Sequence, residues 1–294
     1  MQTNIYTISQ PGVRPEYVDA VQNGVREFMG MFPEYNDDYN IQCIGQWHSD
    51  KQYADKIQYL RQSIETRKLY LPTDDGLYLV PFESTDWAFA AAKQSAISHG
   101  RPNQINASLL LDTMKHDPNN VRNSQISIFI VKDDAFSTSN NNSSSTVSNN
   151  KSNDFVYGLS KKDEGVVFST YRLEWMYGDN PQFLKEVITT LAIHAQGHVF
   201  NATFTGRHNV SDRDGCGPHC NCPGCVMRSE TQVNASVLTN VRLGRKDKHV
   251  TPLCPECIAA VRAHMAKTRG NEQEIEKAIN SFNFVCNSSR TYEP

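Results

Sequence analysis

An apolar helix that ends in two histidines constrains this chain more than any other feature. Apolar residues recur at the three- and four-residue spacing of one helical face, at Leu184, Val187, Ile188 and Leu191. His194 and His198 continue that face, and Asn180-Pro181 provides a cap and a first-turn proline where the helix begins. Residues four apart on a helix lie one above the other, so the two imidazoles can bind one metal ion.

The cysteines provide a second metal-binding pattern. Six of the eight lie within residues 216–257. A disulfide framework is an alternative, but no apolar signal segment follows Met1, and 294 residues can build a core without cross-links. The C-x4-C and C-x-x-C spacings instead indicate metal coordination in a reducing compartment.

The order of these motifs resembles the archaemetzincins, a family of metzincin zinc peptidases. That family's signature runs H-E-x-x-H, then His-Cys, C-x-M and C-x-x-C, and its counterparts here span roughly residues 125–264. The resemblance implies a catalytic zinc bound by His194, His198 and His219, with Met227 as the Met-turn methionine beneath the metal. It also implies a second, structural zinc, whose ligands are Cys220, Cys225, Cys254 and Cys257. Cys216 and Cys222 remain without an assigned role.

The linker to the third histidine departs from the family pattern. Metzincins reach that histidine about six residues after the second one, past a turning glycine. Here Asn201 stands at the turning position, and 20 residues separate His198 from His219. Asparagine is the next-best residue after glycine for a left-handed helix end. Rival third ligands within this insertion are His208, Asp212 and Asp214. We favour His219, because it alone directly precedes the Cys-x4-Cys-x-Met run.

Ala195 occupies the position of the family's general-base glutamate. Its methyl group cannot accept a proton from an attacking water, although the metal can still bind because this position supplies no ligand. Glu186 lies about two turns back on the helix, too far away to substitute. Ala195 is therefore either a natural loss, as in a pseudoenzyme, or a deliberate Glu→Ala change. We favour the deliberate change, because every other part of the site is retained.

Alternating strands and helices predict an α/β fold with a twisted, mainly parallel sheet and backing helices. The helices are expected at 14–31, 87–97, 104–114, 180–198 and 257–267, and the strands at 39–44, 76–80, 126–131, 154–158 and 165–171. We expect an N-terminal α/β subdomain at 1–201, including the active-site helix, and a smaller cysteine-rich, zinc-binding subdomain at 202–294. The metzincin resemblance makes 154–158 the edge strand that pairs with substrate. The Ser/Asn-rich segment 137–153 is expected to be a flexible loop.

Charge and hydropathy narrow the classes of partner. The 29 basic and 32 acidic residues give no electrostatic footprint for nucleic acid or an anionic membrane. No apolar run approaches the ~18 residues of a membrane span. We therefore expect no nucleic-acid or membrane partner. The lack of an N-terminal signal segment predicts a cytoplasmic protein, with export by a route that reads a different signal as the alternative.

These features predict a zinc-dependent metallopeptidase that acts on a peptide or protein substrate, in a form that binds zinc but is inactive or nearly so. The main alternative is a natural pseudoprotease, a zinc-stabilised module that binds a peptide or protein without cleaving it. A purely structural zinc protein is a third possibility. Restoring glutamate at position 195 distinguishes the first two.

Overall fold

The computed structural model describes residues 2–10, 12–46, 70–73, 76–79, 87–115, 125–137, 157–204, 207–212, 217–229 and 234–270. The chain forms two compact units, Met1–Val18 with Asn40–Asp179 and Asp19–Tyr39 with Asn180–Pro294. This division by contacts differs from the expected subdomains 1–201 and 202–294, which stay a prediction. The segment 137–153, apart from Ser137, lies outside the described residues.

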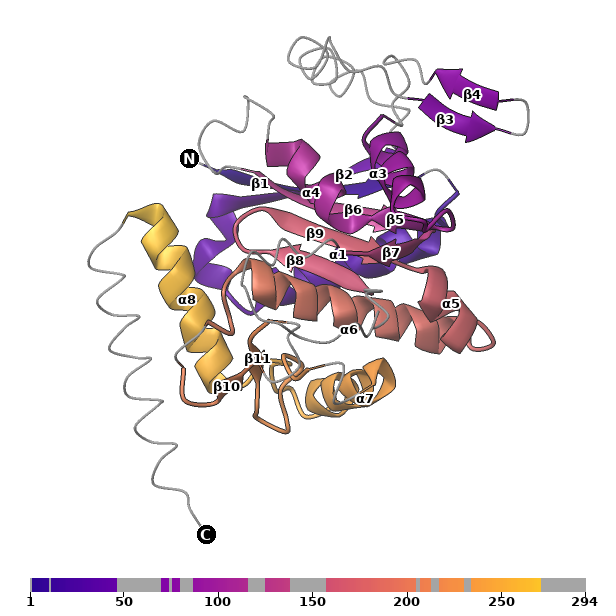
Figure 1. Ribbon diagram of the computed structural model, residues 1–294. Helices are drawn as coiled ribbons and strands as arrows, with labels where there is room; N and C mark the ends of the chain where they lie inside the picture. Colours follow the sequence, from indigo (N-terminus) through magenta and orange to yellow (C-terminus); the bar gives the residue numbers. More distant parts are fainter. Residues whose placement is uncertain are drawn as a thin grey trace, which may run out of the picture. The chain divides into compact units, whose positions relative to one another are not determined.

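The first unit contains a five-stranded sheet with the order β2-β1-β6-β9-β8 (Figure 1). Its strands in that order are Tyr39–Gln46, Thr3–Ser9, Gln125–Val131, Gly165–Ser169 and Gly158–Lys161. Strands β1, β6 and β9 are parallel, and β8 is antiparallel to β9. The prediction of a mixed α/β fold with a mainly parallel sheet is therefore confirmed.

The edge strand β8 differs from the expected strand at 154–158, because the two share only Gly158. Residues 154–156 lie outside the described part of the chain. A tight turn sets the pairing: the Glu164 N–H donates to the Lys161 carbonyl over 3.2 Å, and Asp163 adopts a φ of 61°. This turn helps to set the register in which Gly158–Lys161 pair with β9. The role of this edge in substrate pairing stays a prediction.

Helices α3 (Trp87–Ser98) and α4 (Ala107–Lys115) contribute to the core of the first unit. Their side chains pack with those of the sheet in a cluster of Ile8, Ala92, Ile105, Ala107, Leu110, Leu111, Phe129, Val131, Ala135 and Val167. The expected helix at 104–114 begins later, because β5 (Gln104–Asn106) pairs with β7 (Asp134–Phe136). Asn106 then caps α4 by accepting the Leu109 N–H over 3.1 Å. A separate hairpin is formed by β3 (Tyr70–Thr73) and β4 (Gly76–Leu79).

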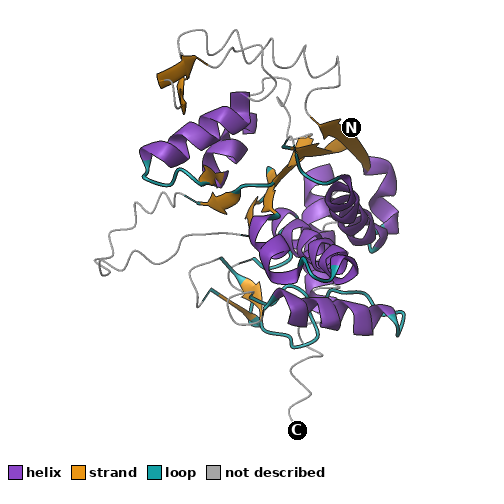
Figure 2. Ribbon diagram, turned by 90° about the vertical axis from the view of Figure 1, so that its right-hand side faces the viewer, coloured by secondary structure: helices purple, strands orange, loops and turns teal. Residues whose placement is uncertain are grey.

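Two further helices were not expected from the sequence. The predicted strand at 165–171 ends at Ser169, and α5 (Tyr171–Tyr177) follows it. In the second unit, α7 (Ala235–Lys246) begins at Asn234, whose side chain accepts the Val237 N–H over 3.0 Å. The second unit also contains the 3-10 helix η1 (Pro33–Asp38), the short strands β10 (Val210–Ser211) and β11 (His219–Cys220), and α8 (Pro255–Arg269) (Figure 2).

Helix α6 (Pro181–Val199) packs closely against α1 (Pro15–Gly30) within the second unit. A Cβ at Gly24 would lie 2.6 Å from both the Ala192 Cβ and the Thr189 carbonyl oxygen, so only glycine allows this approach. The Thr189 hydroxyl donates to the Ala20 carbonyl over 3.1 Å at the same contact. The helix that carries His194 and His198 is thereby fixed along its length.

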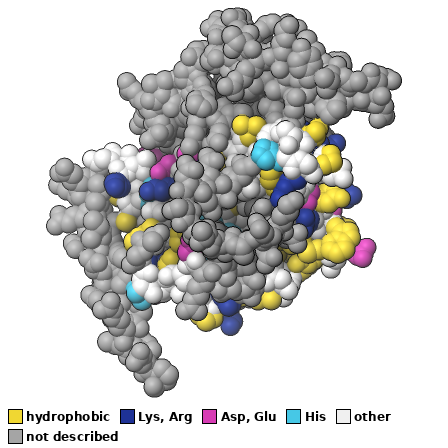
Figure 3. All heavy atoms as spheres, in the orientation of Figure 1, with side chains coloured by type: hydrophobic (Ala, Val, Ile, Leu, Met, Phe, Trp, Pro, Cys, Tyr) yellow, Lys and Arg dark blue, Asp and Glu magenta, His cyan; other side chains and the backbone are white. Residues whose placement is uncertain are grey.

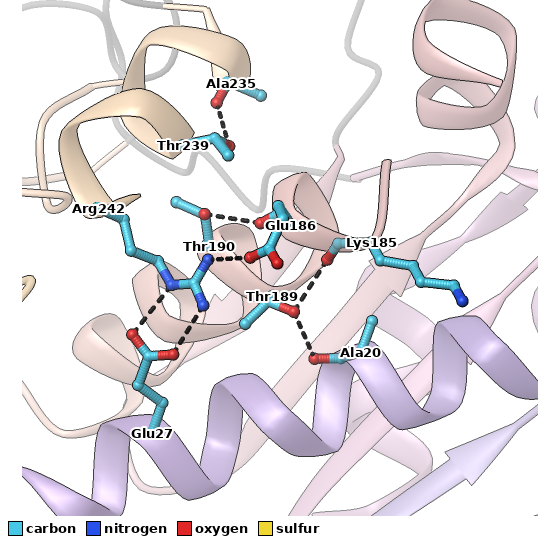
Figure 4. A network of polar contacts seen from close by, with 9 residues as sticks. All are labelled: Ala20, Glu27, Lys185, Glu186, Thr189, Thr190, Ala235, Thr239 and Arg242. Atoms are coloured by element: carbon cyan, nitrogen blue, oxygen red, sulfur yellow. Dashed lines mark hydrogen bonds and ion pairs between the residues drawn. The ribbon is translucent and has the colours of Figure 1, made fainter. Parts of the chain in front are cut away.

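A buried arginine joins three helices of the second unit (Figure 4). Arg242 of α7 is only 2% exposed, and its Nε and Nη2 donate to Glu27 of α1 over 3.0 and 2.7 Å. Its Nη1 donates to Glu186 of α6 over 2.7 Å. A planar guanidinium suits such paired carboxylate contacts. Glu186 therefore anchors the helix that carries the two histidines.

On one face of the molecule, the described residues show no single dominant charge. Figure 3 shows apolar, basic and acidic side chains interspersed over the described residues of one face. Among the described helices, none combines the length and apolar character needed to cross a membrane.

Candidate metal centres

Helix α6 begins and ends as its sequence predicts. The Asn180 side chain accepts the Phe183 N–H over 3.0 Å, and Pro181 occupies the first turn. At the other end Asn201 adopts a φ of 58°, and its N–H donates to the His198 carbonyl over 3.1 Å. The Ala202 N–H donates to the Gly197 carbonyl over 2.7 Å, which completes a Schellman motif. The predicted stop at Asn201 is confirmed, and it places His198 in the last helical turn.

Three imidazoles converge beside this helix. The Nε2 atom of His198 lies 3.1 Å from that of His194 and 3.3 Å from that of His219. Tetrahedral zinc with Zn–N bonds of about 2.0–2.1 Å requires nitrogens about 3.3–3.4 Å apart. His194 and His219 are only 6% and 7% exposed. The spacing of the three nitrogens, two of them on buried rings, therefore fits a zinc ion.

Hydrogen bonds on the far side of the rings orient these nitrogens. His194 donates from Nδ1 to the Val226 carbonyl over 2.7 Å, and His219 donates from Nδ1 to the Gly217 carbonyl over 2.8 Å. A carbonyl oxygen only accepts, so both Nδ1 atoms carry protons. In the neutral forms of His194 and His219, Nε2 then carries the lone pair that can bind a metal. Nδ1 of His198 lies 3.4 Å from the Thr203 hydroxyl oxygen.

Burial favours the neutral form of two of these rings. Desolvation lowers the pKa of His194, and it lowers the pKa of His198 still further, with added repulsion from the neighbouring imidazoles. His194 and His198 therefore favour the neutral form, which is the form that binds a metal.

The structure brings His219, and neither His208 nor Asp212, to the histidine pair. His208 is exposed. Asp212 instead accepts the Gly217 N–H over 2.9 Å, so it supports the residue whose carbonyl orients His219. The other rival, Asp214, lies outside the described residues, as does Cys216.

The side chain after His194 is the buried methyl group of Ala195, which can neither accept nor donate a proton. Glu186, on the same helix, accepts a hydrogen bond from Nη1 of Arg242 over 2.7 Å. The structure thus agrees with the interpretation that Glu186 does not replace a base at position 195.

Met227 lies against the helix between the two histidines. It is fully buried, and its sulfur would be 2.2 Å from a Cβ at Gly197. The packing of this side chain therefore depends on the glycine that directly precedes His198.

The four cysteines with paired spacings form a second cluster. The sulfurs of Cys220 and Cys254 are 3.7 Å apart, as are those of Cys225 and Cys257. A tetrahedral zinc with Zn–S bonds of about 2.3 Å requires sulfurs about 3.8 Å apart. These four cysteines and Cys222 are free thiols, so within the described residues the disulfide alternative is wrong for this segment.

Backbone N–H groups also point at these sulfurs. The Cys222 N–H donates to the sulfur of Cys220 over 3.4 Å, and the Cys254 N–H donates to that of Cys225 over 3.3 Å. Hydrogen bonds from the Cys220 thiol and other neighbouring thiols hold the pKa of Cys254 well below its usual value. The Cys254 thiolate is thus stabilised, whereas hydrogen bonds with the neighbouring thiols raise the pKa of Cys225 and Cys257 well above the usual value. Cys222 is half-buried and is not one of the four clustered ligands.

Neighbouring residues in the chain contribute to different clusters. Residues 219 and 220 contribute one side chain to each cluster. Cys225 belongs to the sulfur cluster, while the next residue, Val226, orients His194 through its carbonyl. No sequence pattern marks Val226 or Gly217, because they act through backbone carbonyls that any residue provides.

No protein-family model matches the chain, and no curated protein does so. Three solved structures are similar to it. Archaemetzincin from Methanopyrus kandleri has a TM-score of 0.46 and 15% identity, over 90% of this chain and 96% of that one. Archaemetzincin from Archaeoglobus fulgidus, complexed with malonate, has a TM-score of 0.41 and 15% identity, over 87% and 99%. A zinc-dependent peptidase from Methanocorpusculum labreanum has a TM-score of 0.41 and 14% identity, over 87% and 99%. Similarity this low carries no weight for activity, which rests on the geometry of the site.

Proposed function

We propose that this chain is a metzincin-type zinc metallopeptidase, of the archaemetzincin kind, in which His194, His198 and His219 bind the catalytic zinc. The observation that carries the proposal is the convergence of three Nε2 atoms, 3.1 and 3.3 Å apart across His198. Two of the rings are fixed by backbone carbonyls in the tautomer that leaves Nε2 free. Met227, packed at Gly197, is the proposed Met-turn residue.

Zinc at this site would supply a Lewis acid that polarises the scissile carbonyl of a peptide or protein substrate and acidifies the attacking water. The protein's own contribution is orientation: Val226 and Gly217 hold His194 and His219, and Thr203 lies behind His198. A carboxylate at position 195 would take the proton of the attacking water and deliver it to the leaving amine. Ala195 cannot move that proton, so the present chain is proposed to be inactive or nearly so.

We assign a second, structural zinc to Cys220, Cys225, Cys254 and Cys257. Their sulfur separations of 3.7 Å and the N–H groups aimed at them support this assignment. A closed set of four thiolates leaves no position for a substrate, as is usual for a metal that stabilises a fold.

A second candidate function rests on Ala195 itself. If the alanine is the natural residue, the chain is a pseudoprotease that binds a peptide or protein without cleaving it. The two candidates share the metal sites and differ in whether the rest of the catalytic machinery is still competent.

Replacing Ala195 tests the choice between them. Ala195→Glu introduces a base, while Ala195→Gln has nearly the same size and cannot accept the proton. Both proteins are compared with the present chain for zinc content and for hydrolysis of a mixture of fluorogenic peptides. Hydrolysis by the Glu protein alone supports the peptidase. Zinc-loaded Glu protein without hydrolysis favours the binding module, and zinc well below one per chain contradicts the metal centre itself.

A further inference from the structure

Arg207 is buried although it lies in the insertion between the second and third histidines. Its side chain is 4% exposed. This burial excludes a solvated position for the guanidinium. A guanidinium that loses its water requires partners for its charge and its N–H groups.

The partners of Arg207 include two of the clustered sulfurs. Its Nη2 donates to Cys257 over 3.2 Å and to Cys220 over 3.4 Å. Its Nη1 donates to the Ala202 carbonyl and its Nε to the Asn209 side chain, each over 2.6 Å. Four of the five N–H groups of the guanidinium are therefore used, and the direction of each is determined.

These contacts matter because of the charge on the sulfur cluster. A zinc ion with four thiolates has a net charge of −2, which is costly to bury without a counter-ion. Arg207 supplies one positive charge in direct contact with two of the four sulfurs. Hydrogen bonds from a charged donor to metal ligands both orient the ligands and stabilise their ionised form.

The same guanidinium also contacts the end of the histidine helix. Ala202 follows the left-handed turn at Asn201 and directly precedes Thr203, whose hydroxyl oxygen lies 3.4 Å from Nδ1 of His198. Arg207 thus connects the four sulfurs with the segment behind a proposed catalytic ligand through a single side chain.

We propose that Arg207 is the counter-charge of the four-cysteine zinc site, and that through Ala202 it also positions the segment behind His198. This inference rests on the two metal sites of the proposed function. It makes Arg207 a positioning residue, because it contacts ligand sulfurs and backbone rather than a substrate.

Cobalt binding tests the proposal without enzyme activity. Metal-free, reduced protein is titrated with Co²⁺ against a chelator. Thiolate-to-cobalt charge-transfer bands report the four-cysteine site, and the second equivalent of Co²⁺ reports the histidine site. Arg207→Met should weaken binding at the four-cysteine site by about 10- to 100-fold and should also weaken the histidine site. The control Arg262→Met removes an exposed arginine that pairs with Glu34, and it should change neither affinity.

Two smaller changes separate charge from hydrogen bonding if the methionine variant folds poorly. Arg207→Lys keeps the charge but loses the planar fork, whereas Arg207→Gln keeps an N–H donor without charge. The counter-charge role predicts that the Lys variant binds Co²⁺ more tightly than the Gln variant at the four-cysteine site. Equal affinities in the Lys, Gln and unchanged proteins would overturn that role, even if melting temperatures fall.

The remaining outcomes are equally specific. An affinity loss confined to the four-cysteine site would overturn the link to His198. Absence of charge-transfer bands from the unchanged protein would overturn the thiolate site itself, and with it the role of Arg207.

Discussion

The sulfur of Met227 lies where a side chain at Gly197 would begin. A Cβ at that glycine would be 2.2 Å from Sδ and 2.7 Å from Cε of Met227, well inside van der Waals contact. The glycine is thus required by the methionine, although it stands inside a helix, where glycine is unfavourable.

Gly197→Ala should therefore destabilise the protein, although replacing a glycine inside a helix by alanine is usually stabilising. Overpacking of a buried contact costs about 1–3 kcal/mol. Met227 should move, and Co²⁺ affinity at the histidine site should fall. The matched control is Gly244→Ala in α7, where nothing lies within 4 Å of the added Cβ, and it should stabilise by about 0.5–1 kcal/mol. Urea denaturation of both variants measures the difference, and two stabilised proteins would contradict the contact.

Arg242→Met should destabilise the second unit by about 3 kcal/mol, because it leaves the facing carboxylates of Glu27 and Glu186 without their cation. We expect the lower end of the destabilisation that is usual for breaking a buried ion pair, because the two carboxylates are partly exposed. Changing both glutamates to glutamine in the same protein should recover part of the loss. Urea denaturation provides the measurement, and failure of the triple variant to recover would show that packing, rather than charge, causes the loss.

His219→Ala should remove one of three nitrogen ligands and weaken the catalytic metal site by at least about 10-fold. His208→Ala is the control, because His208 is exposed and outside the cluster. Competition with a chelator measures zinc affinity in both variants. A loss confined to the His208 variant would contradict the arrangement of the insertion.

Replacing Cys254 and Cys257 together with serine should reduce the zinc content from two ions to one per chain. It should also lower the melting temperature, because the binding free energy of a structural zinc, about 10 kcal/mol or more in small domains, is folding free energy. Cys222→Ser serves as the control, since Cys222 lies outside the proposed ligand set. Full zinc content in the double variant would rule out the four-cysteine site, and loss of zinc in the control would identify Cys222 as a ligand.

The spacing of residues along the sequence was enough to predict features that depend on near neighbours in the chain, such as a helix and its ends. The face of α6, its cap at Asn180 and its stop at Asn201 follow from helical periodicity and capping chemistry. The histidine and cysteine clusters followed from residue spacing together with the family resemblance. The sheet class followed from the alternation of strands and helices, as the parallel pairing of β6 with β9 shows, although β1 was not among the expected strands.

Features set by contacts between distant residues were not predicted. The position of β8 depends on its turn and on pairing with β9, neither of which hydrophobicity reveals. The burial of Arg207 depends on sulfurs up to 50 positions away in the chain. Backbone carbonyls such as that of Val226 leave no mark on side-chain identity, so their role in orienting His194 required the structure.

Three consecutive residues, 225–227, make three different contacts, and this limits insertions and deletions in that part of the chain. Cys225 belongs to the sulfur cluster, the Val226 carbonyl accepts a hydrogen bond from the ring of His194, and Met227 packs against Gly197. One inserted or deleted residue here would shift all three at once, and no substitution elsewhere could restore their register. Insertions and deletions should therefore be absent from residues 219–227.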